Sequence, residues 1–85
     1  MKELQEDIKE LLQKIIVKAY EVNENTNHTV FVEFVGHMNW LDVDICTNGW
    51  KRSTSADIKY EIDLHSEDVL EQLKEILEKL EEMEG

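Results

Sequence analysis

Apolar residues recur at steps of three and four between residues 2 and 22, which places them on one stripe of a helix. Charged residues occupy the opposite side. We expect the helix to end in the asparagine-rich segment 23–28, because asparagine and threonine side chains compete for backbone hydrogen bonds. The apolar stripe consists of Leu4, Ile8, Leu11, Leu12, Ile15, Ile16, Ala19 and Val22.

From residue 29 the apolar period changes to two, which is typical of strands with one covered face. The alternation predicts strands over residues 29–37, 40–47 and 57–64. Three such strands indicate an antiparallel meander that is covered on one side. The residues expected on the covered face are Val30, Val32, Phe34, Leu41, Val43, Ile45, Ile58, Tyr60, Ile62 and Leu64.

The register of the first hairpin is predicted from its turn. A two-residue turn formed by residues 38–39 would place Val32 opposite Ile45 and Phe34 opposite Val43. Both pairs fall on the apolar face, which favours this register.

The second connection contains Asn48-Gly49, a strong signal for a tight hairpin turn. A tight turn at that point would place Arg52 on the apolar face, where an unpaired charge is strongly unfavourable. We therefore expect a loop over residues 48–56. The loop holds Trp50 beside the basic pair Lys51-Arg52, which could contact an acidic group; a mobile loop with Trp50 folded back on the sheet is the favoured interpretation.

A second helix is predicted after Ser66, whose hydroxyl is expected to cap the first free amides. Its apolar stripe is Val69, Leu70, Leu73, Ile76, Leu77, Leu80 and Met83. The predicted fold is therefore α+β, with the order α-β-β-β-α and both helices on one face of a three-stranded antiparallel meander. Residues 1–85 form one domain in this interpretation, because neither a linker nor a repeat divides them.

Composition narrows the function classes. The chain has 85 residues with a net charge of -11, which disfavours nucleic acid as a partner because such binding depends on many phosphate contacts. The sequence shows neither a membrane-spanning stretch nor a signal-peptide pattern, so we expect a cytoplasmic protein. A single cysteine excludes a disulfide within one chain. A core this small supplies only a few kcal/mol of net stability, which favours homo-oligomerisation.

The face of the sheet opposite the predicted helices carries more large apolar side chains than a solvated face normally holds. Phe31, Val35 and Trp40 lie on it, and Trp50 follows in the next loop. These four residues predict an interface, with a homodimer joined through this face or through a sheet edge as the simplest partner arrangement. We therefore expect a non-catalytic protein-interaction module that self-associates or binds a further protein.

The same face offers an alternative, a divalent-metal-dependent hydrolase. Carboxylates and one imidazole occur at Glu33, His37, Asp42 and Asp44, a ligand set that suits Mg²⁺ or Mn²⁺. In the predicted register Glu33 lies opposite Asp44. Acidic residues in strands more often simply face water, and the chain contains neither a nucleophile motif nor a phosphate loop. We expect neither a resident metal nor a cofactor.

A third hypothesis rests on charge. Residues 66–85 contain eight acids and two lysines, a net charge of -6. Such a helix could act as an acidic decoy for a nucleic-acid-binding protein. Surplus acid that merely keeps a small protein soluble is the favoured explanation.

The run from Thr29 to Trp50, with Gly-His-Met-Asn-Trp-Leu-Asp-Val at its centre, resembles a group of small uncharacterised proteins of low-GC Gram-positive bacteria and their phages or mobile elements. The similarity covers about residues 29–65. The group has no assigned activity, so the resemblance implies no functional residue. It implies a compact cytoplasmic accessory protein with an αβββα arrangement.

Overall fold

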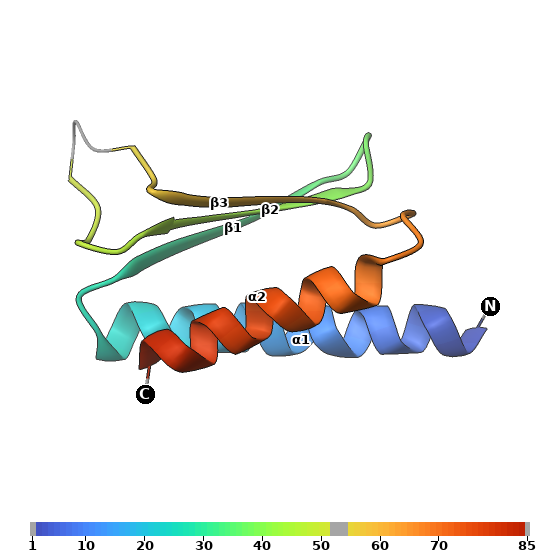
Figure 1. Ribbon diagram of the computed structural model, residues 1–85, viewed down its shortest axis with the longest axis horizontal. Helices are drawn as coiled ribbons and strands as arrows, with labels where there is room; N and C mark the ends of the chain where they lie inside the picture. Colours follow the sequence, from blue (N-terminus) through green and yellow to red (C-terminus); the bar gives the residue numbers. More distant parts are fainter. Residues whose placement is uncertain (1, 52–54, 85) are drawn as a thin grey trace.

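The computed structural model describes residues 2–51 and 55–84, with side chains from residue 6 onward. Helix α1 (Lys2–Asn25) is followed by strands β1 (Thr29–Val35), β2 (Trp40–Cys46) and β3 (Ile58–Asp63), and by helix α2 (Val69–Glu84). The strands form one antiparallel sheet in the order β1-β2-β3. Both helices lie on the same side of this sheet (Figure 1). The α+β class, the element order and the meander are thus confirmed.

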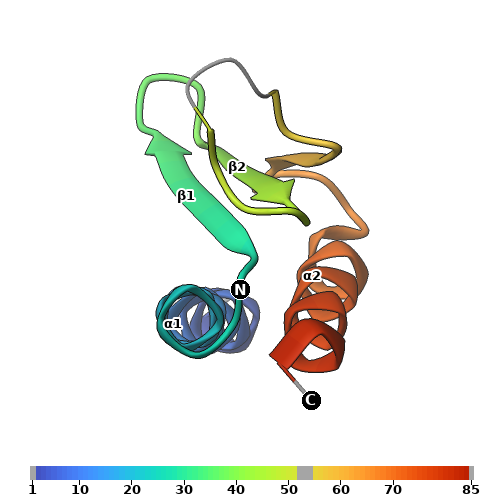
Figure 2. The ribbon, with the colours of Figure 1, turned by 90° about the vertical axis from the view of Figure 1, so that its left-hand side faces the viewer.

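The core lies between the sheet and the helix pair. Central strand β2 contributes Leu41, Val43 and Ile45, each with no more than 2 % of its surface exposed. Viewed from the end, α1 lies beneath β1, and α2 lies beside α1, beneath the β3 side of the sheet (Figure 2). The helices contribute the buried side chains Ile15, Ala19, Val22, Val69, Leu73, Ile76 and Leu80, and β1 and β3 add Val30 and Ile62. The alternating and helical apolar patterns therefore meet in one layer, which removes their surface from water.

The predicted register of the first hairpin is wrong by two residues. Val30 lies opposite Ile45, and Val32 lies opposite Val43. The reason is a four-residue turn over residues 36–39, in which Asn39 adopts a positive φ of 57°. Because a shift of two residues keeps every side chain on its own face, the apolar alternation fits both registers equally well.

Two details of the helices also differ from expectation. The side chain of Ile16 is 56 % exposed, so the buried stripe of α1 is narrower than predicted. Helix α2 begins at Val69, and the buried Ser66 hydroxyl has no hydrogen-bond partner among the described residues, so Ser66 does not cap it. Instead the carbonyl of Asp68 accepts the first bond of the helix, from the amide of Gln72. The side chain of Leu4 lies outside the described part.

A loop replaces the tight turn after β2, as expected. Asp57 anchors its far end, since its carboxylate accepts bonds from the Thr47 amide at 2.9 Å and the Thr47 hydroxyl at 2.6 Å. At its near end the amide of Trp50 donates to the Thr29 hydroxyl at 3.0 Å. Residues 52–54, which include Arg52 of the basic pair, lie outside the described residues.

We expect Gly49→Ala to destabilise the protein while Gly36→Ala has little effect. Gly49 has a φ of +84°, and an added Cβ would lie 2.8 Å from the Asn27 carbonyl oxygen. Positive φ alone costs an L-residue about 1–2 kcal/mol, so we expect a loss of about 2 kcal/mol in the free energy of unfolding. At Gly36 the nearest atom would lie at an ordinary 3.7 Å. Urea denaturation of both variants measures the difference, and equal midpoints would contradict it.

Candidate functional site

The four residues predicted to form an interface fall into two groups at opposite ends of the outer face, the sheet face that the helices leave uncovered. Val35 lies directly opposite Trp40, beside the hairpin turn, and both side chains are partly exposed. Phe31 and Trp50, both largely exposed, belong to the other end. Phe31 and Val35 are four residues apart on β1, about 13 Å along the strand. The structure therefore does not gather the four residues into one continuous patch.

A row of three carboxylates crosses the outer face between these two groups. Glu33 lies opposite Asp42, and Asp42 lies opposite Glu61 on the third strand. The predicted pairing of Glu33 with Asp44 is wrong, because the register is shifted; Asp44 lies between Phe31 and Lys59. Like charges opposite one another destabilise a sheet. The buried Oδ1 atom of Asp42 also has no hydrogen-bond partner in the described structure.

The residues of the metal hypothesis are not arranged as a ligand set. His37 lies in the exposed turn over residues 36–39, beyond the end of β1. Within residues 2–51 and 55–84, no group of three or more histidine, cysteine or acidic side chains is placed to hold a metal ion. The effect expected of this row of carboxylates is therefore mutual repulsion across the sheet.

The strand β1 has a free edge, and its protection changes along its length. At Val30 the side chain of Asn23 closes this edge, accepting from the Val30 amide at 2.7 Å and donating to the Val30 carbonyl at 3.0 Å. Further along the same face, exposure rises from 5 % at Val30 to 56 % at Phe34. Figure 2 shows the reason: β1 rises away from α1 toward its C-terminal end.

Exposed side chains of α1 continue this surface. Ile16 and Tyr20, both more than half exposed, precede Asn23 by seven and three residues and so share its side of the helix. Two helical turns span about 10 Å, the length of about three strand residues. Because α1 and β1 run in opposite directions (Figure 1), Ile16 lies below the Phe34 end of the strand. We call Ile16, Tyr20, Val32 and Phe34 the β1 edge surface.

Sequence reasoning missed the β1 edge surface because it assigned both Ile16 and Phe34 to the core. A weak signal was present. The apolar stripe of α1 includes adjacent residues, Ile15 and Ile16, whose side chains lie about 100° apart, so a narrow contact buries only one of them. Which of them remains exposed depends on where the sheet ends, and that is a property of the assembled fold.

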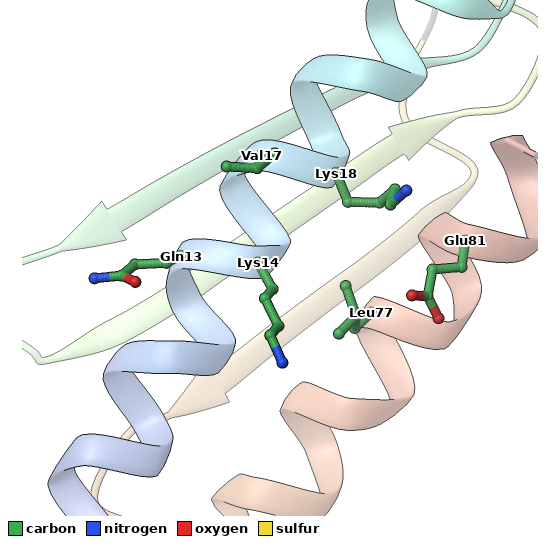
Figure 3. A pocket seen from close by; sticks show the side chains of 6 residues that line it. All are labelled: Gln13, Lys14, Val17, Lys18, Leu77 and Glu81. Carbon is green, nitrogen blue, oxygen red and sulfur yellow. The ribbon is translucent and has the colours of Figure 1, made fainter.

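A shallow groove of about 280 Å³ runs between the helices on the side away from the sheet. Figure 3 shows Lys14 and Lys18 of α1 and Leu77 and Glu81 of α2 extending into it. Lys18 forms ion pairs with Glu84 at 2.7 Å and with Glu21 at 2.9 Å. These partners raise the pKa of Lys18, and their carboxylates compensate its positive charge, so Lys18 offers little to an anion.

Two further observations bear on the class of protein. Cys46 is free and buried, as expected of an unreactive thiol. No helix of the described residues is long and apolar enough to cross a membrane.

Comparison with protein-family models, with curated proteins and with solved structures finds no match. The geometry of the sheet and its surroundings is therefore the basis for inferring function.

We expect Asp42→Asn to stabilise the protein by roughly 0.2–1 kcal/mol, because it removes the central charge of the row formed with Glu33 and Glu61. Asp44→Asn is the matched control. Asp44 lies opposite Lys59, so its loss removes an attraction and is expected to lower stability or leave it unchanged. Urea unfolding at neutral pH measures both variants. A destabilised Asp42→Asn protein would show that this carboxylate has a stabilising partner.

The ion pair that joins the helices predicts a dependence of stability on pH. Hydrogen bonds from Lys18 and then Asn25 hold the pKa of Glu84 below its ordinary value of 4.5. A lowered folded-state pKa gives stability that is fully present at neutral pH and is lost as the pH falls through 4.5 and below. We expect Glu84→Gln to lower stability at neutral pH and to lose less on acidification than the wild type.

The control for this measurement is Glu78→Gln, which changes an exposed acid of the same helix for which no ion pair is found among the described residues. Denaturant unfolding at stepwise lower pH compares the three proteins. Parallel curves for the wild type and Glu84→Gln would remove Glu84 as a source of the pH dependence.

Proposed function

We propose that the chain is a non-catalytic protein-interaction module that self-associates as a homodimer through β1. The observation that carries this proposal is the gathering of large exposed apolar side chains on one strand and on the helix beneath it. Phe34 is exposed on β1 itself, and Ile16 and Tyr20 are exposed on α1. Contiguous apolar surface of this kind marks interaction sites on small proteins.

The size of this surface suits a dimer. A fully buried large side chain covers about 150–250 Å², so these three half-exposed side chains present roughly 100 Å² each, or roughly 300 Å² in one copy. Two copies together would contribute roughly 600 Å² of apolar area. Interfaces are about 60 % apolar, so this corresponds to roughly 1,000 Å² in total. That area is about the size that a biological interface is expected to reach.

The distribution of charge is compatible with a second copy. More than half of the net charge of -11 belongs to residues 66–85, which form α2 and its flanks. Helix α2 lies beneath the β3 side of the sheet, away from the free edge of β1 (Figure 2). Two copies that met through β1 would therefore keep their most acidic helices apart, and added salt would screen the remaining repulsion.

We expect Phe34→Glu to raise the dimer dissociation constant at least about tenfold, since it replaces an exposed aromatic anchor with a charge at the centre of the proposed contact. Val17→Glu is the matched control. Val17 is 57 % exposed, as Phe34 is at 56 %, but it borders the groove between the helices. Sedimentation equilibrium over micromolar concentrations measures both variants, at low salt and at high salt.

Self-association of the wild type should strengthen as salt is added, because the two copies carry the same sign of charge. A basic partner protein would show the opposite salt dependence. A wild-type chain that stays strictly monomeric at high micromolar concentration and high salt would overturn the proposed function.

A further inference from the structure

We infer that the second copy binds by strand addition: two β1 strands pair antiparallel along their free edges, with Phe34 of each copy at a two-fold axis. This inference rests on the proposed self-association and specifies how it occurs. The two three-stranded sheets would become one continuous six-stranded sheet with all four helices on one side.

The backbone of β1 has unused hydrogen-bonding groups where this pairing requires them. Both polar groups of Val30 point away from β2, since both bond to the side chain of Asn23. In an antiparallel ladder every second residue points the same way, so the amides and carbonyls of Val32 and Phe34 also face outward. No hydrogen bond to these outward groups is found among the residues that the structure describes.

The opposite edge of the sheet is protected against such pairing. Backbone groups in β3 alternate in the same way as in β1. The amides and carbonyls of Lys59, Glu61 and Asp63 face the free edge of β3. Charged residues along an edge strand are a common defence against pairing with another chain. Strand β1 carries a single charge, Glu33, among seven residues.

Two features select the register. Asn23 blocks the edge at Val30, so the open stretch begins at Val32 and continues to the turn, with Phe34 at its centre. Centring the axis on Glu33 would place the two Glu33 carboxylates opposite each other, which like charges disfavour. Centring it on Phe34 places Glu33 opposite Val35 of the other copy and brings the two Phe34 rings together.

The helices leave room for this arrangement. Strand β1 slants across α1 and rises from it, so that its C-terminal end projects beyond the helix (Figure 2). The side of α1 that carries Ile16 and Tyr20 would then face the same side of α1 in the second copy. Their exposed surface, more than half of each residue, supplies the apolar contact beneath the paired strands.

Single cysteine variants in a Cys46→Ala background test the register. Residues that pair across the axis have Cα atoms about 5.5 Å apart, within reach of a disulfide. Phe34→Cys should therefore form covalent dimers on mild oxidation. Glu33→Cys alone should not, because its two copies would be offset along the strands to more than about 7 Å. A mixture of Glu33→Cys and Val35→Cys should cross-link as a heterodimer.

Hydrogen exchange of the wild type tests the same pairing without a substitution. The amides of Val32 and Phe34 should exchange slowly at high protein concentration and quickly on dilution, whereas the amide of Glu33, which bonds to β2, should stay protected throughout. A dimer in which Val32 and Phe34 exchange quickly and Phe34→Cys fails to cross-link would overturn strand addition and leave self-association standing. A strictly monomeric protein would overturn both.

Discussion

The burial of one face of β2 between the two outer strands and against two helices is the constraint on which the rest of the structure depends. Leu41, Val43 and Ile45 are almost fully removed from water, and the buried side chains of both helices belong to the same cluster. In a domain this small, that cluster supplies most of the favourable free energy. The two helices cover β1 and β3 only where they extend beneath these outer strands. The side chain of Val30 on β1 is almost fully covered, whereas more than half of Phe34 is exposed, and the exposed edge surface is the consequence.

Much of the fold was predictable because it depends on local periodicity. A period of 3.6, then 2, then 3.6 indicates the five elements, and the apolar faces indicate that both helices lie on one side. The loop expected in place of a tight turn at Asn48-Gly49 is also confirmed; it was predicted because a tight turn would place the charge of Arg52 on the apolar face. The predicted hairpin register is wrong, because a two-residue shift preserves the apolar faces and only the geometry of the turn distinguishes the alternatives. Asn39 with its positive φ decides that geometry.

The candidate site was predictable in part. The outer face does carry Phe31, Val35 and Trp40, but the row from Glu33 through Asp42 to Glu61 divides it. That row could not be foreseen from a register in which Glu33 faced Asp44. The exposure of Phe34 could not be predicted from the sequence for a different reason. Alternation assigns a residue to a face, yet it does not say whether a helix extends far enough to cover that face, which is set by how β1 slants across α1.

The asymmetry between the two edges of the sheet also bears on how far association would proceed. A contact between two different surfaces can repeat indefinitely and form a fibre, whereas a two-fold contact uses the same surface on both copies and closes. Pairing through β1 would use up the unprotected edge of each copy. The assembly would end at two β3 edges, where Lys59, Glu61 and Asp63 oppose further strand addition. The same charges that leave β3 unpaired would therefore limit the proposed assembly to a dimer.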